Sequence, residues 1–173
     1  MHPYSNAVID TPAPVPVPDQ PAAANLHDGS ADKKTGLTFR HNLTIYLKDS
    51  NAYGNTYFAR YFEWQGVCRE RWFYECIARD MLQAHGVFIT KHAEQDYLQE
   101  TFPFQEISCE VNAYRIKRCS FWLEFRFFAD GQQVSSGRQH IVFANHDKRI
   151  TALPELVIKR IERYQLAGTE IRK

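Results

Sequence analysis

The polar residues best able to take part in chemistry lie close together, in the stretch from Asp49 to Arg69. The stretch opens with D-S-N-A-Y-G-N, and such a run of Asp, Ser, Asn and Gly is typical of a loop that leads into a helix. The first N–H groups of a helix have no partner within it, so this end of the helix favours negative charge. The loop therefore predicts a site that stabilises the oxyanion formed when a carbonyl group is attacked.

Two polar residues, Gln65 and Arg69, interrupt the apolar face of the helix that is expected over residues 57–84. On a wheel of about 100° per residue they share that face with Phe58, Tyr61, Phe62, Trp72, Phe73 and Cys76. A guanidinium buried among aromatic rings costs several kcal/mol unless it is paired. Arg69 therefore either forms a buried ion pair, or caps carbonyl groups at a subunit contact, or points a fixed positive charge into a substrate cavity.

The other polar residues of the stretch are assigned supporting roles. Asp49 is the most obvious acid, but its position favours capping of the loop over catalysis. Asn51 cannot act as a general base, because an amide has no accessible basic form. Gly54 is expected to allow a close approach of the backbone. Glu63 and Glu70 fall on the opposite face of the helix, which disfavours either one as a catalytic base.

The order of the expected elements is strand, long helix, four strands and a short helix. The strands are expected at residues 37–47, 87–97, 104–116, 120–129 and 133–144, and the short helix follows Pro154. Asp130-Gly131 predicts a tight hairpin turn between the last two strands. One long helix and about five antiparallel strands can bury their apolar faces only if the sheet wraps around the helix. The fold class is therefore α+β.

Composition predicts one globular domain with tails. Residues 1–36 are rich in proline and alanine and are expected to be disordered, because such a segment buries too little apolar surface. The domain is expected at residues 37–167 and a short tail at 168–173. The net charge of +1 gives no reason to expect a nucleic-acid partner. The basic cluster Arg115, Lys117 and Arg118 predicts a solvated turn, or alternatively a phosphate-binding patch for CoA or a carrier-protein arm.

Cysteine spacing and hydropathy indicate in which cellular compartment the protein is expected. The four cysteines lack the paired short spacings of zinc sites, so we expect reduced thiols, a cytoplasmic protein and neither metal nor cofactor. No run approaches the roughly 18 apolar residues of a membrane span.

The loop and the helix together resemble a known family. D-S-N-A-Y-G-N-T-Y-F, followed by A-R-Y-F-E-W-Q-G-V-C-R-E, resembles the 4-hydroxybenzoyl-CoA thioesterase-like branch of the hotdog superfamily, in which D-x-D/N-x-x-G-x-x-Y/F precedes the long helix. The second part is similar to the thioesterases that accompany iterative enediyne polyketide synthases. Their signature resembles D-T-N-x-x-G-N-V-Y-F and then W-Q-G-R-C-R-E. The resemblance covers residues 41–165.

This resemblance implies a hotdog fold, homodimers that often pair into tetramers, and active sites at the dimer interface. It also implies hydrolysis of a polyketide or polyene chain from an acyl carrier protein. Many relatives place a catalytic Asp where this chain has Asn51, whereas enediyne-type members share the Asn and are thought to work without a catalytic carboxylate. In them the residues that match Asn51 and Arg69 polarise the carbonyl and orient water. Supporting groups are expected from Asp49, Gly54, Asn55, Tyr57 and Gln65, and a substrate tunnel from Phe58, Tyr61, Phe62 and Trp72, with strand aromatics such as Phe121.

Two alternatives stay open. One is an acyl-CoA thioesterase of general or aromatic-CoA type, and the other is a non-catalytic acyl-binding or partner module of a synthase complex. A hotdog dehydratase is disfavoured because no His follows Asp49 within the loop or the first turns of the helix. A serine hydrolase is disfavoured because the chain has no G-x-S-x-G elbow.

Overall fold

The computed structural model describes residues 36–79 and 86–166. The expected tails at residues 1–36 and 168–173 therefore lie outside the described residues, except for Gly36. The helix expected over residues 57–84 ends earlier than predicted, at Ile77, because Ala78 is extended (φ −166°, ψ 125°). Residues 80–84 of the expected range lie outside the described residues.

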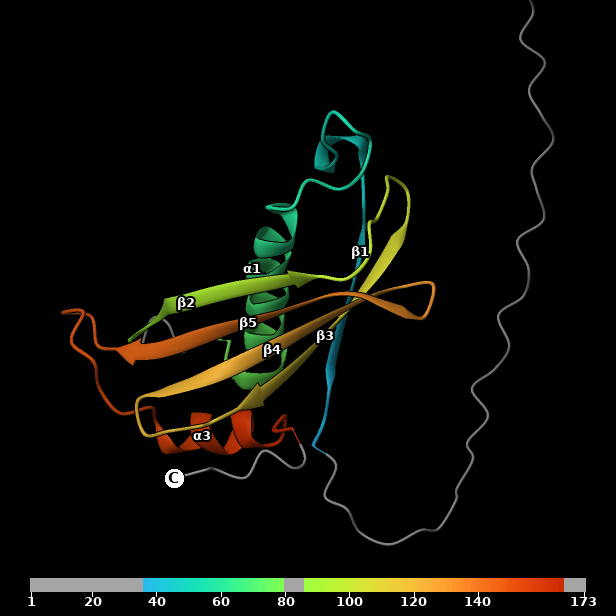
Figure 1. Cartoon of the computed structure of the whole chain (residues 1–173). Helices are drawn as coiled ribbons and strands as arrows, with labels where there is room; N and C mark the ends of the chain where they lie inside the picture. The colour runs from blue at the N-terminus through green and yellow to red at the C-terminus, as the bar shows by residue number, and fades with distance from the viewer. Residues whose placement is uncertain (1–35, 80–85, 167–173) are drawn as a thin grey trace, which may run out of the picture. The chain divides into compact units, whose positions relative to one another are not determined.

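Five antiparallel strands form one sheet in the order β1-β3-β4-β5-β2, as Figure 1 shows. The strands are β1 (Phe39–Thr44), β2 (Val87–Tyr97), β3 (Glu106–Tyr114), β4 (Ser120–Ala129) and β5 (Gln132–Ala144). The expected hairpin turn joins β4 to β5, with positive φ angles of 50° at Asp130 and 77° at Gly131. In this order β1 and β2 form the two edges of the sheet.

Helix α1 (Arg60–Trp72) lies across one face of the sheet and continues as a π-helix, Phe73–Ile77 (Figure 1). The expectation that the helix begins at Tyr57 was wrong. Thr56 is extended, since it forms an antiparallel bridge with Ser50 and donates its N–H to the carbonyl oxygen of Thr101 at 2.8 Å. The N–H of Arg60 then donates to the carbonyl oxygen of Tyr57, as in a turn, so the helix begins at Arg60.

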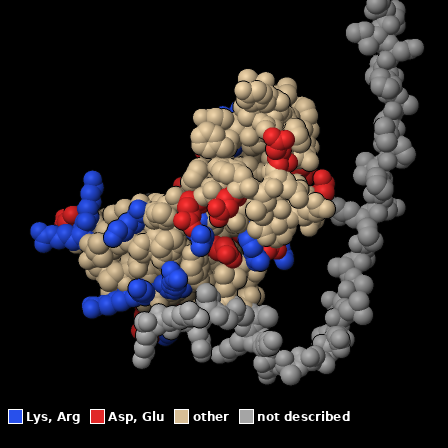
Figure 2. All heavy atoms as spheres, viewed as in Figure 1, with Lys and Arg blue, Asp and Glu red and all other residues tan. Residues whose placement is uncertain are grey.

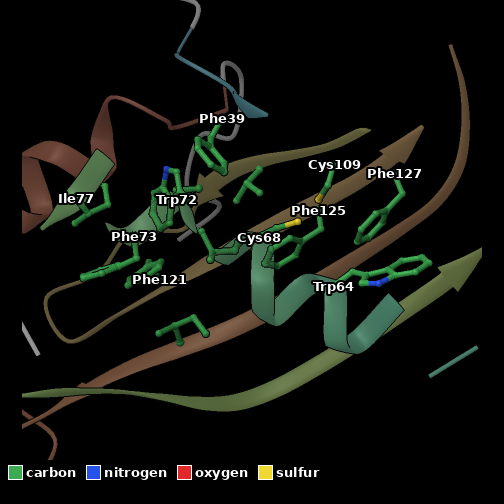
Figure 3. Close-up of a cluster of buried hydrophobic side chains, with 14 of the residues drawn as sticks. Phe39, Trp64, Cys68, Trp72, Phe73, Ile77, Cys109, Phe121, Phe125 and Phe127 are labelled. Atoms are coloured by element: carbon green, nitrogen blue, oxygen red, sulfur yellow. The ribbon is translucent and has the colours of Figure 1, made fainter. Parts of the chain in front are cut away.

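The core lies between α1 and the sheet (Figure 3). Strand β4 alternates, so its buried residues Phe121, Leu123, Phe125 and Phe127 all face the helix. The buried stripe of α1 consists of Tyr61, Trp64, Gln65, Cys68 and Trp72, at the spacing of one helix face.

Two residues expected on the buried face are exposed instead. Phe62 is 37% exposed because it lies one residue, and therefore about 100°, away from Tyr61 on the helix. Phe58 is 56% exposed, and it precedes the first residue of the helix, so the wheel does not apply to it.

The C-terminal helix α3 (Glu155–Glu162) buries Val157 and Ile161 against the core. Pro154 lies directly before the helix, as expected from the sequence. Within the described ranges, no helix is long and apolar enough to cross a membrane.

Candidate active site

Asp49 shapes the loop that precedes α1. Its side chain is only 5% exposed, and Oδ2 accepts the backbone N–H of Tyr46 at 2.9 Å. Its other oxygen, Oδ1, lies 3.5 Å from Nε of Arg60, the first residue of α1. Together with the hydrogen bond that the backbone N–H of Tyr57 donates to the carbonyl oxygen of Asp49 at 2.8 Å, these contacts tie the start of the loop to the start of the helix. This geometry is that of a residue that fixes the loop.

Asn51 presents a hydrogen-bond donor. Its Oδ1 accepts the backbone N–H of Tyr53 at 2.8 Å, and because a backbone N–H can only donate, the orientation of the amide is fixed. The side-chain NH₂ group is therefore the free end, with no partner among the described residues. Gly54 closes the turn by donating to the carbonyl oxygen of Asn51 at 3.0 Å. The expected close backbone approach at Gly54 was wrong: no described atom outside its chain neighbours would lie within 4 Å of a Cβ atom there, and the glycine is needed for its positive φ of 84°.

The loop borders a cavity of about 330 Å³, which we call the loop cavity. Its lining consists of Asn51, Asn55, Thr56, Phe58, Tyr61, Tyr97, Leu98, Gln99, Glu100 and Thr101. Asn55 joins the loop to the opposite wall, since its Nδ2 donates to Oε1 of Glu100 at 2.7 Å. Its Oδ1 is buried and accepts no hydrogen bond within the described chain. Tyr57, 43% exposed, does not line this cavity.

A chain of hydroxyl groups runs behind the same wall. Oγ1 of Thr56 donates to the carbonyl oxygen of Thr101 at 3.0 Å, and Oγ1 of Thr101 donates to Oγ1 of Thr56 at 2.8 Å. The single proton of Thr101 is thereby used, so the Tyr61 hydroxyl donates to Oγ1 of Thr101, at 2.9 Å. Burial raises the pKa of Tyr61 above its ordinary value, which keeps this phenol a donor. Glu100 and Thr101 have no local signal in the sequence, because their contacts with the loop join residues 45 positions apart.

Arg69 is a half-buried cation held by neutral groups. Its Nη1 donates to Oγ1 of Thr90 at 2.5 Å and to Oε1 of Gln139 at 3.0 Å. Among the described residues no carboxylate forms an ion pair with it. Burial lowers the pKa of Arg69 below its ordinary value, and the charge of Glu70 opposes this shift only in part. The described chain therefore offers no buried ion pair to explain Arg69.

Arg69 lines a second cavity, of about 520 Å³, which we call the helix cavity. Its lining consists of Val67, Arg69, Glu70, Arg71, Trp72, Phe73, Tyr74, Ala78, Arg79, Phe88, Phe121 and Ile141. The floor is aromatic, since Phe88 packs on Phe73 and on Phe121, with ring centroids 4.5 and 5.8 Å apart. The helix cavity thus combines an apolar floor with guanidinium groups at its rim.

Gln65 lies between the helix and the sheet, away from both cavities. It is fully buried, and its Nε2 donates to the carbonyl oxygen of Glu94 at 3.0 Å and to Oε1 of Gln95 at 2.5 Å. Gly137 on β5 leaves room for it, because a Cβ atom at that position would collide with the Gln65 amide. Oε1 of Gln65 is buried and has no partner in the described part of the chain.

The two central predicted residues are thus placed in different cavities of one chain. Asn51 lies in the loop cavity with Asn55, Phe58 and Tyr61. Arg69 lies in the helix cavity, together with Trp72 and Phe121, and Phe62 lines neither cavity. A single chain therefore separates the amide donor from the guanidinium.

One helix packed on a five-stranded antiparallel sheet of this strand order is the hotdog fold, as the sequence predicted. The chain belongs to the thioesterase-like superfamily, whose family model matches residues 45–161. This membership confirms the prediction of a thioester hydrolase at the level of the family. It does not extend to the enediyne-associated branch.

Individual relatives agree with this assignment. A 1,4-dihydroxy-2-naphthoyl-CoA hydrolase of Synechococcus sp. (strain WH7803) is 25% identical over 129 residues, which cover 66% of this chain and 82% of that protein. The solved structure of the dynemicin thioesterase superposes with a TM-score of 0.69 at 20% identity, covering 76% of this chain and 99% of that one. The solved structure of a 1,4-dihydroxy-2-naphthoyl-CoA thioesterase from Synechocystis superposes with a TM-score of 0.65 at 15% identity, covering 72% of this chain and 95% of that one.

Proposed function

We propose that this protein hydrolyses acyl thioesters in a site that holds the thioester carbonyl between Arg69 of one protomer and Asn51 of a second copy. The observation that carries the proposal is Arg69 itself. It is a half-buried guanidinium that has only neutral acceptors within the described chain and lies in the wall of a cavity with an apolar floor. A cation held in this way attracts the negative charge that develops on a carbonyl oxygen under attack.

Strand β2 supports the proposal that two copies complete the site. It is an edge strand, so one side of its backbone is free to pair with another strand. Near its start, Phe88 lines the helix cavity and Thr90 holds Arg69, whereas Tyr97 at its end lines the loop cavity. Antiparallel pairing of β2 with β2 of a second copy about a two-fold axis places the start of one strand beside the end of the other. The helix cavity of one protomer then adjoins the loop cavity of its partner.

Exposed apolar side chains support the same arrangement. Phe58 and Tyr97 line the loop cavity, Val67 and Tyr74 line the helix cavity, and each of the four is between 42% and 56% exposed. Exposed apolar groups gathered near an unpaired strand edge mark an interaction surface. A second copy at this edge would cover them and close a tunnel that includes Phe58, Tyr61 and Trp72. We propose a dimer as the minimum unit, and a pair of dimers as the assembled form.

The reaction needs no catalytic carboxylate. The oxygen of a water molecule adds to the carbonyl carbon while Arg69 and the free NH₂ of Asn51 stabilise the oxyanion. The carbon–sulfur bond then breaks, and the water supplies the proton that the leaving thiolate takes up. The products are a carboxylate, a thiol and one proton in solution. Removal of one such donor typically costs on the order of 10²–10³ in rate.

For the natural substrate we propose a polyketide or polyene chain on the acyl carrier protein of an iterative synthase. We propose that the enzyme acts in the cytoplasm. The enediyne-type signature around Asn51 and Arg69 and the likeness to the dynemicin thioesterase favour this substrate. The second candidate is an acyl-CoA thioesterase, which the relative named for 1,4-dihydroxy-2-naphthoyl-CoA favours.

Hydrolysis of matched acyl-carrier and acyl-CoA thioesters by the wild type and by Arg69→Ala tests the proposal. We expect turnover by the wild type, faster on the carrier protein, and loss of turnover in the variant with its fold and oligomer size unchanged. Turnover on neither carrier by the wild type would support the non-catalytic acyl-binding module instead.

A further inference from the structure

A groove rich in arginine lies beyond the end of α1, beside the helix cavity. Its volume is about 360 Å³, and we call it the arginine groove. It is lined by Tyr74, Glu75, Cys76, Ile77, Ala78, Arg79, Arg160 and Arg163. Three of these residues, Tyr74, Ala78 and Arg79, also line the helix cavity, so the two hollows share a wall.

The positive charge of the groove is not neutralised within the described chain. Glu75 lines the groove but is ion-paired with Arg71, outside it. Arg79, Arg160 and Arg163 have no carboxylate partner among the described residues. Guanidinium groups around one hollow repel each other, so the groove favours an anion.

Two of these arginines have contacts within the described chain that direct them to the groove. Arg160 donates to the carbonyl oxygen of Ile77, the last residue of the π-helix, and the Arg79 guanidinium lies 5.2 Å from the centroid of the Tyr74 ring. Arg163 directly follows α3, three residues after Arg160, and its backbone is still helical (φ −61°, ψ −24°), so the two residues lie on one side of the helix end. Short π-helical segments are frequent at functional sites, and this one separates the groove from the helix cavity.

A second group of basic side chains lies at one end of the sheet, away from the arginine groove. Figure 2 shows Lys and Arg side chains over the end of the sheet where β5 ends and the β3–β4 turn lies. The expected basic cluster Arg115, Lys117 and Arg118 occupies that turn, and none of its members lines the helix cavity or the arginine groove. The sequence thus singled out basic residues that the described cavities do not use.

We propose that the arginine groove binds the phosphate of the pantetheine arm that carries the acyl group. This inference rests on the proposed function. The phosphate is common to CoA and to a carrier protein, and arginine binds phosphate with paired hydrogen bonds. From Arg69 to Ile77 the helix advances about 12 Å, and an extended pantetheine arm spans roughly 15 Å at the advance per bond of an extended chain. The arm therefore crosses the helix cavity, and the acyl chain enters the loop cavity of the partner protomer.

Substrates that differ only in the phosphate test this assignment. KM is measured for octanoyl-pantetheine, octanoyl-4′-phosphopantetheine, octanoyl-CoA and an octanoyl carrier protein. The proteins are the wild type, Arg163→Gln and the double variant Arg160→Gln/Arg163→Gln, whose residues line the groove only. Lys159→Gln is the matched control, because Lys159 lies on α3 with its side chain 66% exposed and does not line the groove. Calorimetric binding of free 4′-phosphopantetheine is measured with the same proteins.

We expect the double variant Arg160→Gln/Arg163→Gln, whose two residues line the groove but not the helix cavity, to raise KM about tenfold for the three phosphate-bearing substrates. It should leave KM for octanoyl-pantetheine unchanged and weaken binding of 4′-phosphopantetheine about tenfold as well. Lys159→Gln should change none of these values. An equal rise for octanoyl-pantetheine, or a rise confined to octanoyl-CoA, would overturn the inference. If the wild type hydrolyses no thioester, the proposed function fails. The calorimetric binding of 4′-phosphopantetheine then decides alone whether the groove binds this phosphate.

Discussion

The guanidinium of Arg69 lies 3.0 Å from the side-chain oxygen of Gln139, a residue that is 4% exposed. The two residues are 70 positions apart in the chain, on α1 and β5, and the contact is a cation on a neutral amide. A carboxylate at position 139 would hold Arg69 more strongly but would cancel its charge. The amide orients the cation and leaves the charge available.

Replacement of Gln139 separates the effect of orienting the Arg69 guanidinium from the effect of its positive charge. Gln139→Leu removes one acceptor of Arg69, so we expect kcat to fall about tenfold while KM changes little. Gln139→Glu supplies a charged acceptor, so the midpoint of thermal unfolding should rise by a few degrees while kcat falls at least as far as in Gln139→Leu. Steady-state kinetics and calorimetry on both variants measure this. Full activity in Gln139→Glu would show that the charge of Arg69 takes no part in the reaction.

Substitutions of Asn51 test whether position 51 serves the reaction as a hydrogen-bond donor or as a general base. Asn51→Ala removes the free NH₂ group and should lower kcat by tenfold or more. Asn51→Asp keeps the shape but replaces the donor by an acceptor, so it should lower kcat at neutral pH at least as far. Unchanged or higher activity in Asn51→Asp, measured by release of thiol, would contradict a mechanism without a carboxylate.

Glu100 is the carboxylate that lines the loop cavity with Asn51. We assign it the role of holding Asn55, whose Nδ2 donates a hydrogen bond to Oε1 of Glu100 at 2.7 Å. Glu100→Gln retains an acceptor oxygen and should keep kcat within about threefold of wild type, whereas Glu100→Ala should cost more. If Glu100→Gln abolishes turnover and removes the acid limb of the pH profile, Glu100 is a general base and the proposed mechanism is wrong.

His140 gives the stability of the fold a dependence on pH. It stacks on Trp122 with centroids 4.8 Å apart, and burial, helped by the charges of Lys91, Lys117 and His92, lowers its pKa below the ordinary 6.5. Below pH 6.5 the unfolded chain takes up a proton at this residue before the folded chain does. The free energy of unfolding should therefore fall between pH 6.5 and the lower folded pKa, and His140→Gln should reduce the fall. Urea unfolding at several pH values measures it, with the exposed His146→Gln as control, and an unchanged slope in His140→Gln would refute the assignment.

Gly137 tests the packing of Gln65. A methyl group at this position meets the Gln65 and Gln95 amides, so Gly137→Ala should lower the free energy of unfolding by about 1–3 kcal/mol. Combining it with Gln65→Ala should recover part of that loss, because the colliding amide is gone. Denaturant unfolding of the two single variants and the double variant gives the coupling energy. Additive losses would mean that the two residues do not compete for the same space.

Local patterns accounted for the elements, and contacts distant in sequence accounted for what was missed. The runs of apolar, β-branched or aromatic residues at 120–129 and 87–97 predicted β4 and β2 with the bounds that the structure has. In β4 every second residue is buried, so its sequence reports its own buried face, whereas the edge strand β2 has no buried residue. The start of α1 was missed because Thr56 pairs with Ser50 and with Thr101, a residue 45 positions away, and this keeps the chain before the helix extended. The wheel identified Arg69 as anomalous, but its acceptors Thr90 and Gln139 belong to other strands and have no signal near Arg69 in the sequence.

Complementation between two inactive variants tests the shared site most directly. Arg69→Ala and Asn51→Ala are each purified, mixed in equal amounts under conditions that exchange subunits, and assayed for thioester hydrolysis. If each site takes Arg69 from one protomer and Asn51 from its partner, half of the sites in a mixed dimer are intact, and random mixing restores about a quarter of wild-type activity. No recovery, with mixed dimers demonstrated by differential tags and mass spectrometry, would contradict the site shared between two chains.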